Sequence, residues 1–416
     1  MTKFSIRSIS PKKIPILSIF SLLTVSNFAL AFCVSEYFRR QSFGSILSFD
    51  SSDQPGPLDT VLYPPRALFG THYFGDFFQI LQMSKLDTPY VSANGKLISQ
   101  YPPIGHWILY PFTLLTTRAA VMVYICLAVV ILFFTLRKLT ELIDPRERSH
   151  VMMLFFLSGP VISMIDRGNT TVIIFCITVL SLFTKMSFFS KITLQILSIG
   201  MKFFPIVFFF EIEKQQESKK IKSSLIVEIV GVVVMTLLGM AVLGSGFRNN
   251  LLGFSHAFSD QGRIESEVRV PGVSVSAFLE GIQSLTSYSL SNQTSSFITL
   301  AIAIVALSFV VLQYVGPLSK GNFMEERVLS IMIFLSIAPK VVGTYQLIFL
   351  LIPLVLYLKR DLDKNKASVI TICLVLLILP MRYEIAAGVF LNSVLFAPIL
   401  VFLALNLVCV QIRRTK

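Results

Sequence analysis

Charged residues, cysteine and histidine are all scarce in this chain. Only 14% of its 416 residues are charged, whereas a soluble globular domain carries about 25%. Hydrophobic residues make up 54% of the chain, and its mean hydropathy is +0.74. This balance excludes an ordinary soluble domain. It predicts an integral membrane protein whose length is taken up by crossings of about 20 apolar residues each.

The few cysteines and histidines show no pattern of metal ligands. The chain has five Cys and four His, with no CxxC pair and no Cys/His spacing typical of a zinc site. Neither a GxxxxGK[ST] loop nor a GxGxxG loop occurs, so no nucleotide-binding motif is present. We therefore expect no metal site and no cofactor, and the cysteines are interpreted as small apolar core residues.

The apolar runs predict an all-α polytopic protein of about 10 to 12 membrane segments. They lie at about residues 14–34, 103–136, 151–165, 170–184, 192–212, 225–244, 296–315, 328–358, 367–382 and 386–410. The run 103–136 is long for one crossing, so we expect a helix from Pro103 to Thr117 at the outer interface beside a span at 119–136. The runs 192–212 and 328–358 are each interrupted by a Pro and a Lys. Each interruption predicts a re-entrant hairpin of two short helices.

The net charge of +13 is explained by membrane topology and not by nucleic acid. With the N-terminus inside and the spans alternating, most Lys and Arg residues fall in the inner segments, as the positive-inside rule requires. Acidic residues divide about evenly between the two sides. We therefore predict a single domain over 1–416 in the plasma (inner) membrane, both termini cytoplasmic, with large outer loops at about 35–102 and 245–295. Small polar pieces gather at the outer face, where they are expected to line a cavity.

Five short motifs follow one another along the chain. They are "GDFFQ" (75–79), "YPP" (101–103), "DRGN" (166–169), "MKFFP" (201–205) and "APKVVGTYQ" (338–346). In this order, over about 75–360, they resemble glycosyltransferase family 87, the alpha-mannosyltransferase-like membrane proteins of the GT-C class. The family pattern often has Ser-Pro and His where this chain has Ala338-Pro339 followed by Tyr345-Gln346. No role of a histidine is therefore carried over to that segment.

The resemblance implies a GT-C-like bundle whose extracytoplasmic loops form the active-site face. It implies an inverting hexosyl transfer, with mannose as the first candidate sugar, from a polyprenyl-phosphate sugar to an extracytoplasmic glycolipid or polysaccharide. The expected partners are thus the lipid bilayer, the lipid-linked donor and the acceptor, with no nucleic acid among them.

The polar residues of these motifs suit that chemistry. Asp76, a carboxylate in the first outer loop, is the candidate catalytic base for the acceptor hydroxyl. Positive charge for the departing phosphate is expected from Lys202, Arg167 and Arg263. Further substrate contacts are expected from a set of four polar and aromatic residues. They are Tyr101, Asn169, Tyr345 and Gln346.

Structural interpretations of the same residues remain open at this point. Asp76 can be a solvated loop acid or a helix-capping acid, and Arg167 can be one half of a local ion pair with Asp166. Asn169 can cap the helix that follows. Pro102 and Pro103 are expected to start a helix, because proline fits the first turn without losing a hydrogen bond.

Two other functions also remain open. A transporter or flippase of lipid-linked sugars would fit the composition, although no internal repeat or matched pair of broken helices is visible. An O-antigen ligase or polymerase would use a large basic outer loop with histidine. Loop 245–295 fits that poorly, because it holds three Arg against four acids and only His256.

Overall fold

The structure is a computed structural model of the chain. It describes residues 20–26, 29, 75–84, 89–90, 99, 101–215, 221–243, 246–255, 274–286, 290–315, 323–337, 344–364, 367–379, 384–386 and 389–415. These ranges are predominantly helical, as the apolar runs predict. The α-helices are α3 (Gly75–Ser84), α4 (Pro103–Thr113), α5 (Thr117–Thr140), α6 (Arg148–Phe156), α7 (Gly159–Arg167), α8 (Thr171–Phe183), α9 (Phe188–Met201), α10 (Phe209–Gln215), α11 (Ile221–Val242), α13 (Val275–Thr286), α14 (Asn292–Val315), α15 (Met324–Ile337), α16 (Leu351–Lys364), α17 (Val369–Ile378) and α18 (Leu391–Thr415). Two 3₁₀ helices are η1 (Phe204–Phe208) and η3 (Thr344–Leu350).

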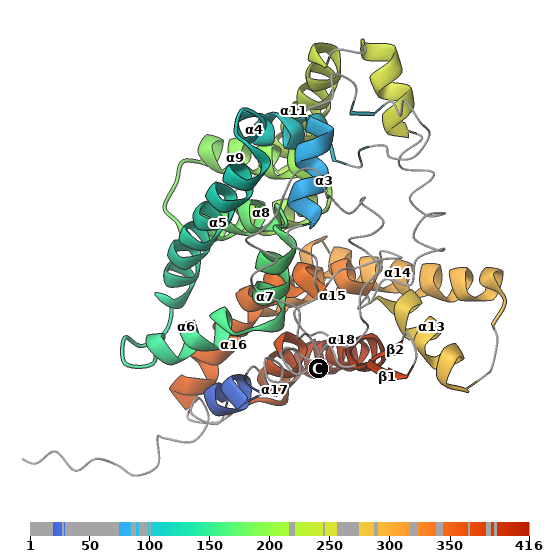
Figure 1. Ribbon diagram of the computed structural model, residues 1–416. Coiled ribbons are helices and arrows are strands. Elements are labelled where there is room, and N and C mark those ends of the chain that lie inside the picture. Colours follow the sequence, from blue (N-terminus) through green and yellow to red (C-terminus); the bar gives the residue numbers. More distant parts are fainter. Residues whose placement is uncertain are drawn as a thin grey trace, which may run out of the picture.

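Figure 1 shows two groups of helices with α7 between them. The first group holds α3, α4, α5, α8, α9 and α11, and the second holds α14 to α18. Helix α7 contacts α3 and α5 of the first group and packs along η3, which leads into α16 of the second. The groups also share a buried core, in which the rings of Phe175 and Phe349 meet edge to face at 5.6 Å.

The start of α4 is held closely between two neighbouring helices. Gly200 of α9 faces Ile104, and Gly239 of α11 faces Pro103. A Cβ at either glycine would overlap the facing side chain, so the absence of a side chain allows the helices to approach. Tyr101, two residues before α4, is thereby brought beside the end of α9.

Two helices among the described residues are long and apolar enough to cross a membrane, Ala119–Thr140 and Gln293–Tyr314. Two bent pairs, Arg148–Phe156 with Gly159–Ile165 and Ile226–Val242 with Phe247–Ser255, bring the number to four if each pair is one span. Shorter apolar helices include Thr171–Phe183 and Val369–Ile378. Membrane-helix character is thus present, while the larger number of segments expected from the sequence stays a prediction.

The first of the two runs interrupted by Pro and Lys contains a break between helices. Helix α9 ends at Met201, Lys202 is extended (φ −152°, ψ 140°), and η1 begins at Phe204. The Gln195 side chain closes this turn by donating to the carbonyl of Pro205. In the second run, α15 ends at Ile337 and η3 begins at Thr344. The run 103–136 is likewise divided, with α4 ending at Thr113 and α5 beginning at Thr117.

One element departs from the all-helical expectation. Strands β1 (Glu384–Ala386) and β2 (Val389–Phe390) pair antiparallel, with Glu384 opposite Phe390 and Ala386 opposite Val389. The sequence did not predict this pair, because the strands are too short to show an alternating pattern.

A buried ion pair joins α10 to α15. The Arg327 guanidinium donates to both carboxylate oxygens of Glu211, each at 2.8 Å, and the Tyr314 hydroxyl of α14 donates to the same carboxylate at 3.0 Å. Glu211 is completely buried, and a buried charge is tolerated only when it is paired and hydrogen-bonded. The contact therefore fixes the relative positions of α10, α14 and α15.

Candidate functional site

The Tyr-Pro-Pro sequence starts α4, as predicted. Pro102 is the N-cap residue with φ −58° and ψ 157°, and Pro103 is the first helical residue. The Pro102 carbonyl accepts the N–H of Gly105 at 2.9 Å, so the two imino acids begin the helix without losing a backbone donor. The Tyr101 ring lies directly before this start and faces α9.

The "DRGN" sequence forms a sharp turn between α7 and α8. Gly168 ends α7 in the left-handed region (φ 60°, ψ 34°), and the N–H groups of Gly168 and Asn169 bond to the carbonyls of Ile165 and Met164. This is a Schellman termination, in which glycine is favoured because it has no Cβ. The Asn169 side-chain oxygen then accepts the N–H of Thr171, the first residue of α8, at 2.9 Å. The helix-capping contact expected for Asn169 is therefore confirmed.

The turn aims two side chains at Asp76 in the first turn of α3. Nε and Nη2 of Arg167 donate to the two carboxylate oxygens of Asp76 at 2.8 and 2.7 Å. The Asn169 amide donates to the same carboxylate at 2.5 Å. The Asp76 side chain is only 14% exposed and that of Arg167 is 23% exposed. The Asp76 carboxylate and the Arg167 guanidinium thus make a two-point contact, the geometry in which such pairs are strongest. The two residues are 91 positions apart in the sequence.

Lys202 joins the same cluster from the break after α9. Its ammonium donates to Asn169 at 2.9 Å and to the Thr171 hydroxyl at 3.1 Å. The nitrogen also lies 5.4 Å from the centre of the Tyr101 ring and 5.3 Å from that of Tyr345. Tyr345 belongs to η3 and lies 5.3 Å from the Arg167 guanidinium as well. Both cations are therefore within cation–π range of aromatic faces.

The environment shifts the ionisation of each charged group. Burial opposes ionisation of Asp76, but Arg167, Asn169 and Lys202 outweigh it and lower the pKa of the carboxyl below its ordinary value. Burial lowers the pKa of the Lys202 ammonium to about 8, although Asp76 acts in the opposite direction. Burial also opposes the charge on Arg167, but Asp76 outweighs it and raises the pKa of the guanidinium. At neutral pH the cluster therefore holds one carboxylate and two cations.

Most of the predicted site residues meet in this cluster. The structure brings together Asp76, Tyr101, Arg167, Asn169, Lys202 and Tyr345. Gln346 follows Tyr345 in η3 and is partly exposed. Arg263 lies outside the described residues, so its expected role stays a prediction.

Thr171 was missed by the sequence reasoning. Its hydroxyl bonds to both Asn169 and Lys202, at 2.5 and 3.1 Å. Its position two residues after a capping asparagine was the available signal, because that spacing places it in the first turn of the same helix.

The model of glycosyltransferase family 87 matches residues 100–337, more than half of the chain. The chain belongs to glycosyltransferase family 87. A search of curated proteins and a search of solved structures each returned no match.

Five residues of the cluster lie inside the part that matches family 87, namely Tyr101, Arg167, Asn169, Thr171 and Lys202. Asp76 lies before the matched region and Tyr345 lies after it. The connection of these two residues with the family 87 region therefore rests on the geometry. Asp76 is connected with the matched region by its bidentate contact to Arg167. Tyr345 is connected with it by the contacts of its ring to Arg167 and Lys202.

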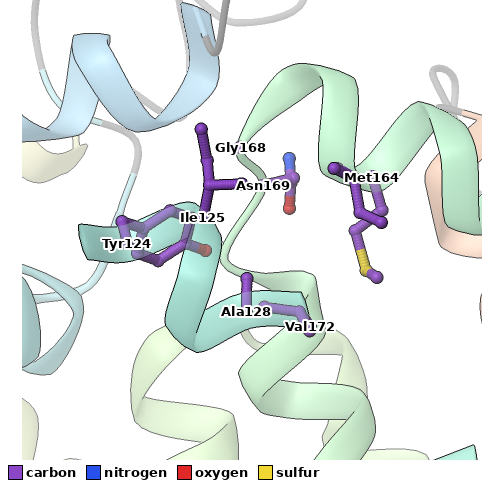
Figure 2. A pocket seen from close by; sticks show the side chains of 8 residues that line it. Tyr124, Ile125, Ala128, Met164, Gly168, Asn169 and Val172 are labelled. Carbon is purple, nitrogen blue, oxygen red and sulfur yellow. The ribbon is translucent and has the colours of Figure 1, made fainter. Parts of the chain in front are cut away.

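A small cavity of about 10 Å³ lies beside Asn169 (Figure 2). Apolar side chains of α5, α7 and α8 line it, together with Tyr124 and Asn169. A volume near 10 Å³ holds about one water molecule, so this cavity is too small for a sugar. Elsewhere in the described part of this family 87 chain, no group of three or more His, Cys, Asp or Glu side chains is arranged to hold a metal ion.

Proposed function

We propose that this family 87 protein transfers a hexose, mannose in the first instance, from a polyprenyl-phosphate sugar to a glycolipid or polysaccharide outside the cytoplasm. The observation that carries the proposal is the cluster of one carboxylate and two cations, built from α3, the α7–α8 turn and the break after α9. Its net charge is positive, which suits an anionic donor. Transport without bond formation would not require a carboxylate beside the cations.

Asp76 is proposed as the general base. It removes the proton from the acceptor hydroxyl while that oxygen forms a bond to the anomeric carbon. The bond from the anomeric carbon to the phosphate oxygen breaks, and its electron pair leaves with the phosphate. The anomeric centre is inverted, because the acceptor attacks directly. Pairing with Arg167 keeps Asp76 ionised, the form that a base requires.

Lys202 and Arg167 are proposed to bind the donor phosphate, which changes from a diester monoanion towards a monoester dianion. Lys202 directs two of its donors at Asn169 and Thr171, and an ammonium has one more. Arg167 likewise uses only part of its guanidinium on Asp76. In a partly dry site a charge pair 4 Å apart contributes about 4 kcal/mol, against about 1 kcal/mol in water. Growing negative charge is therefore stabilised where it develops.

Tyr101 and Tyr345 are proposed to face the sugar. The Tyr345 ring lies against both cations and the Tyr101 ring lies against Lys202, so a sugar attached to the bound phosphate would meet aromatic faces. Asn169 supports this arrangement by contacting Asp76 and Lys202 at the same time.

The test is product identification with purified protein in lipid nanodiscs. The protein is incubated with radiolabelled polyprenyl-phosphate mannose and a membrane glycolipid extract, and the labelled product is isolated. We expect a new glycosidic bond of inverted configuration. We expect less product when polyprenyl-phosphate glucose replaces polyprenyl-phosphate mannose as the donor. Movement of the donor across the bilayer without a new bond would instead establish a flippase. Product formed only from a diphosphate-linked donor would indicate a ligase or polymerase.

A further inference from the structure

Outside the polar cluster, α4 carries a buried histidine to which the proposed chemistry assigns no role. His106 is 2% exposed, and both of its ring nitrogens contact serine hydroxyls. Nδ1 lies 2.8 Å from the hydroxyl of Ser84, and Nε2 lies 2.7 Å from that of Ser99. Ser84 is the last residue of α3, the helix that carries Asp76, and Ser99 precedes Tyr101 by two residues. Figure 1 shows α3 beside α4.

The hydrogen-bond partners determine the direction of every bond in this network. The Ser84 hydroxyl donates its only proton to the carbonyl of Ile80 at 2.7 Å, so it must accept from Nδ1–H of His106. In a neutral imidazole Nε2 then accepts the proton of the Ser99 hydroxyl. That hydroxyl oxygen in turn accepts the backbone N–H of Tyr101 at 3.2 Å. One directed chain thus runs from the backbone of Tyr101 through His106 to α3.

A second contact holds the same backbone. The Tyr90 hydroxyl donates to the carbonyl of Tyr101 at 2.6 Å, and its ring lies edge-on to His106 with centroids 5.7 Å apart. The N–H of Ser99 donates to the carbonyl of Pro89 at 3.0 Å. Tyr90 and Ser99 are completely buried, so water cannot replace these bonds without opening the packing.

We infer that His106 is a positioning residue. Its neutral imidazole holds α3, the helix that carries Asp76, in a fixed position relative to the backbone of Tyr101. The imidazole is too deeply buried to touch substrate. Burial also lowers the pKa of His106 to about 4, which keeps the neutral tautomer at working pH. The inference rests on the proposed function, because it assigns His106 to the placement of the proposed base and of the ring beside Lys202.

The two hydrogen bonds of His106 can be removed one at a time. In His106→Asn the amide can reproduce the Nδ1–H contact to Ser84, whereas in His106→Gln the side-chain oxygen can reproduce the Nε2 contact to Ser99. Ser99→Ala and Ser84→Ala remove the same contacts from the other side. His150→Asn and His150→Gln are the matched controls, because His150 lies on the exposed start of α6.

Initial rates of transfer are measured for all six variants at varied donor concentration, with thermal unfolding as a check on folding. We expect loss of the Ser99 contact to raise KM for the donor about tenfold, because Tyr101 flanks Lys202. Loss of the Ser84 contact is expected to lower kcat about tenfold at unchanged KM, because α3 carries Asp76. A merely structural role would instead lower the unfolding midpoint in all four variants without this division between KM and kcat. That pattern, or rates equal to wild type, overturns the inference.

Hydrogen exchange of the intact protein supplies a readout that does not need activity. The backbone N–H of Tyr101 is expected to exchange faster in Ser99→Ala and His106→Asn, and to stay protected in Ser84→Ala and the His150 controls. Unchanged protection in the first two variants would overturn the directed chain. Failure of the wild type to transfer sugar would count against the proposed function and against the catalytic side of the inference, while altered kinetics of a working enzyme bear on His106 alone.

Discussion

The carboxylate proposed as base is in contact with the guanidinium proposed as phosphate ligand. Asp76 and Arg167 make a bidentate pair at 2.7 and 2.8 Å, and both side chains are largely buried. Breaking a buried pair by removing one partner is costly, because the other charge stays buried without compensation. This pair therefore contributes to stability as well as to the charge balance of the site.

A double-mutant cycle on this pair tests its strength. Asp76→Asn and Arg167→Gln are each expected to lower the free energy of unfolding. The double variant is expected to lose less than the sum, by about 1 to 3 kcal/mol. Thermal or denaturant unfolding in detergent measures this coupling. Lys138→Gln and Glu141→Gln form the matched control on an exposed pair, for which coupling of about 0.5 kcal/mol or less is expected. Additive effects at Asp76 and Arg167 would show that the pair does not form.

Lys202 makes the site sensitive to alkaline pH. Burial lowers the pKa of its ammonium to about 8, so the charge that would bind phosphate is lost as pH rises through that value. We expect kcat/KM for the donor to fall above about pH 8. The fall in kcat is expected at higher pH, because bound phosphate stabilises the ammonium.

The same pH profile of Lys202→Arg provides the check. An arginine stays protonated, so the alkaline fall in kcat/KM is expected to move to higher pH even if the rate itself is lower. Lys185→Arg is the matched control on an exposed lysine and is expected to leave the profile unchanged. An alkaline limb at the same pH in Lys202→Arg would assign the ionisation to another group.

At the scale of elements, the site depends on where helices begin and end. The Tyr-Pro-Pro start of α4, the turn after α7 and the break at Lys202 each place one part of the cluster. The start of α4 is in turn fixed by the close approach of α9 and α11 at two glycines. Changes at those glycines should therefore affect the site without touching it.

Alanine at the three glycines around α4 is expected to have graded effects. Gly239→Ala would place a Cβ against the rigid Pro103 ring, and Gly200→Ala against the flexible end of Ile104. We expect Gly239→Ala to cost about 1 to 3 kcal/mol of stability, and Gly200→Ala less. At Gly105 the nearest atom would be 3.5 Å away, so Gly105→Ala is the control. Unfolding midpoints give the ranking, and equal midpoints for Gly239→Ala and Gly105→Ala would contradict the close packing.

These local elements are also the part of the site that could be predicted from sequence. Proline at a helix start, Gly168 followed by Asn169 at a turn, and Lys202 in an apolar run each have a local physical meaning. The contact of Asp76 with Arg167 spans 91 residues, and the bonds of His106 to Ser84 and Ser99 depend on how α3 packs on α4. No local pattern encodes such contacts, so Arg167 was equally open to a pair with its neighbour Asp166.

At the scale of the whole molecule, two described helices are long and apolar enough to cross a membrane, or four if each bent pair is one span, and the larger number expected from the apolar runs stays a prediction. Some described apolar helices, such as Thr171–Phe183 and Phe188–Met201, are shorter than the roughly 20 residues that cross a bilayer. The run 192–212 is divided at Lys202, whose ammonium is satisfied by protein contacts and not by lipid. The sidedness of the chain stays a prediction from the distribution of Lys and Arg.

Single cysteines in a variant lacking the five native cysteines test that sidedness. Ser291→Cys, next to the start of α14, is expected to react with a membrane-impermeant maleimide on intact cells, because loop 245–295 is predicted to lie outside. Arg146→Cys, between α5 and α6, is expected to react only after permeabilisation, because loop 137–150 is predicted to lie inside. Both positions are exposed. The reverse labelling would place the proposed site on the cytoplasmic side.

The most direct test of the account is the rate of sugar transfer by Asp76→Asn at saturating donor, compared with wild type at the same folded concentration. An amide cannot take the acceptor proton, so we expect the rate to fall by about a hundredfold to ten-thousandfold, while the variant still binds the polyprenyl-phosphate sugar. A variant that is folded, binds donor and transfers sugar at the wild-type rate would contradict the assignment of Asp76 as the base.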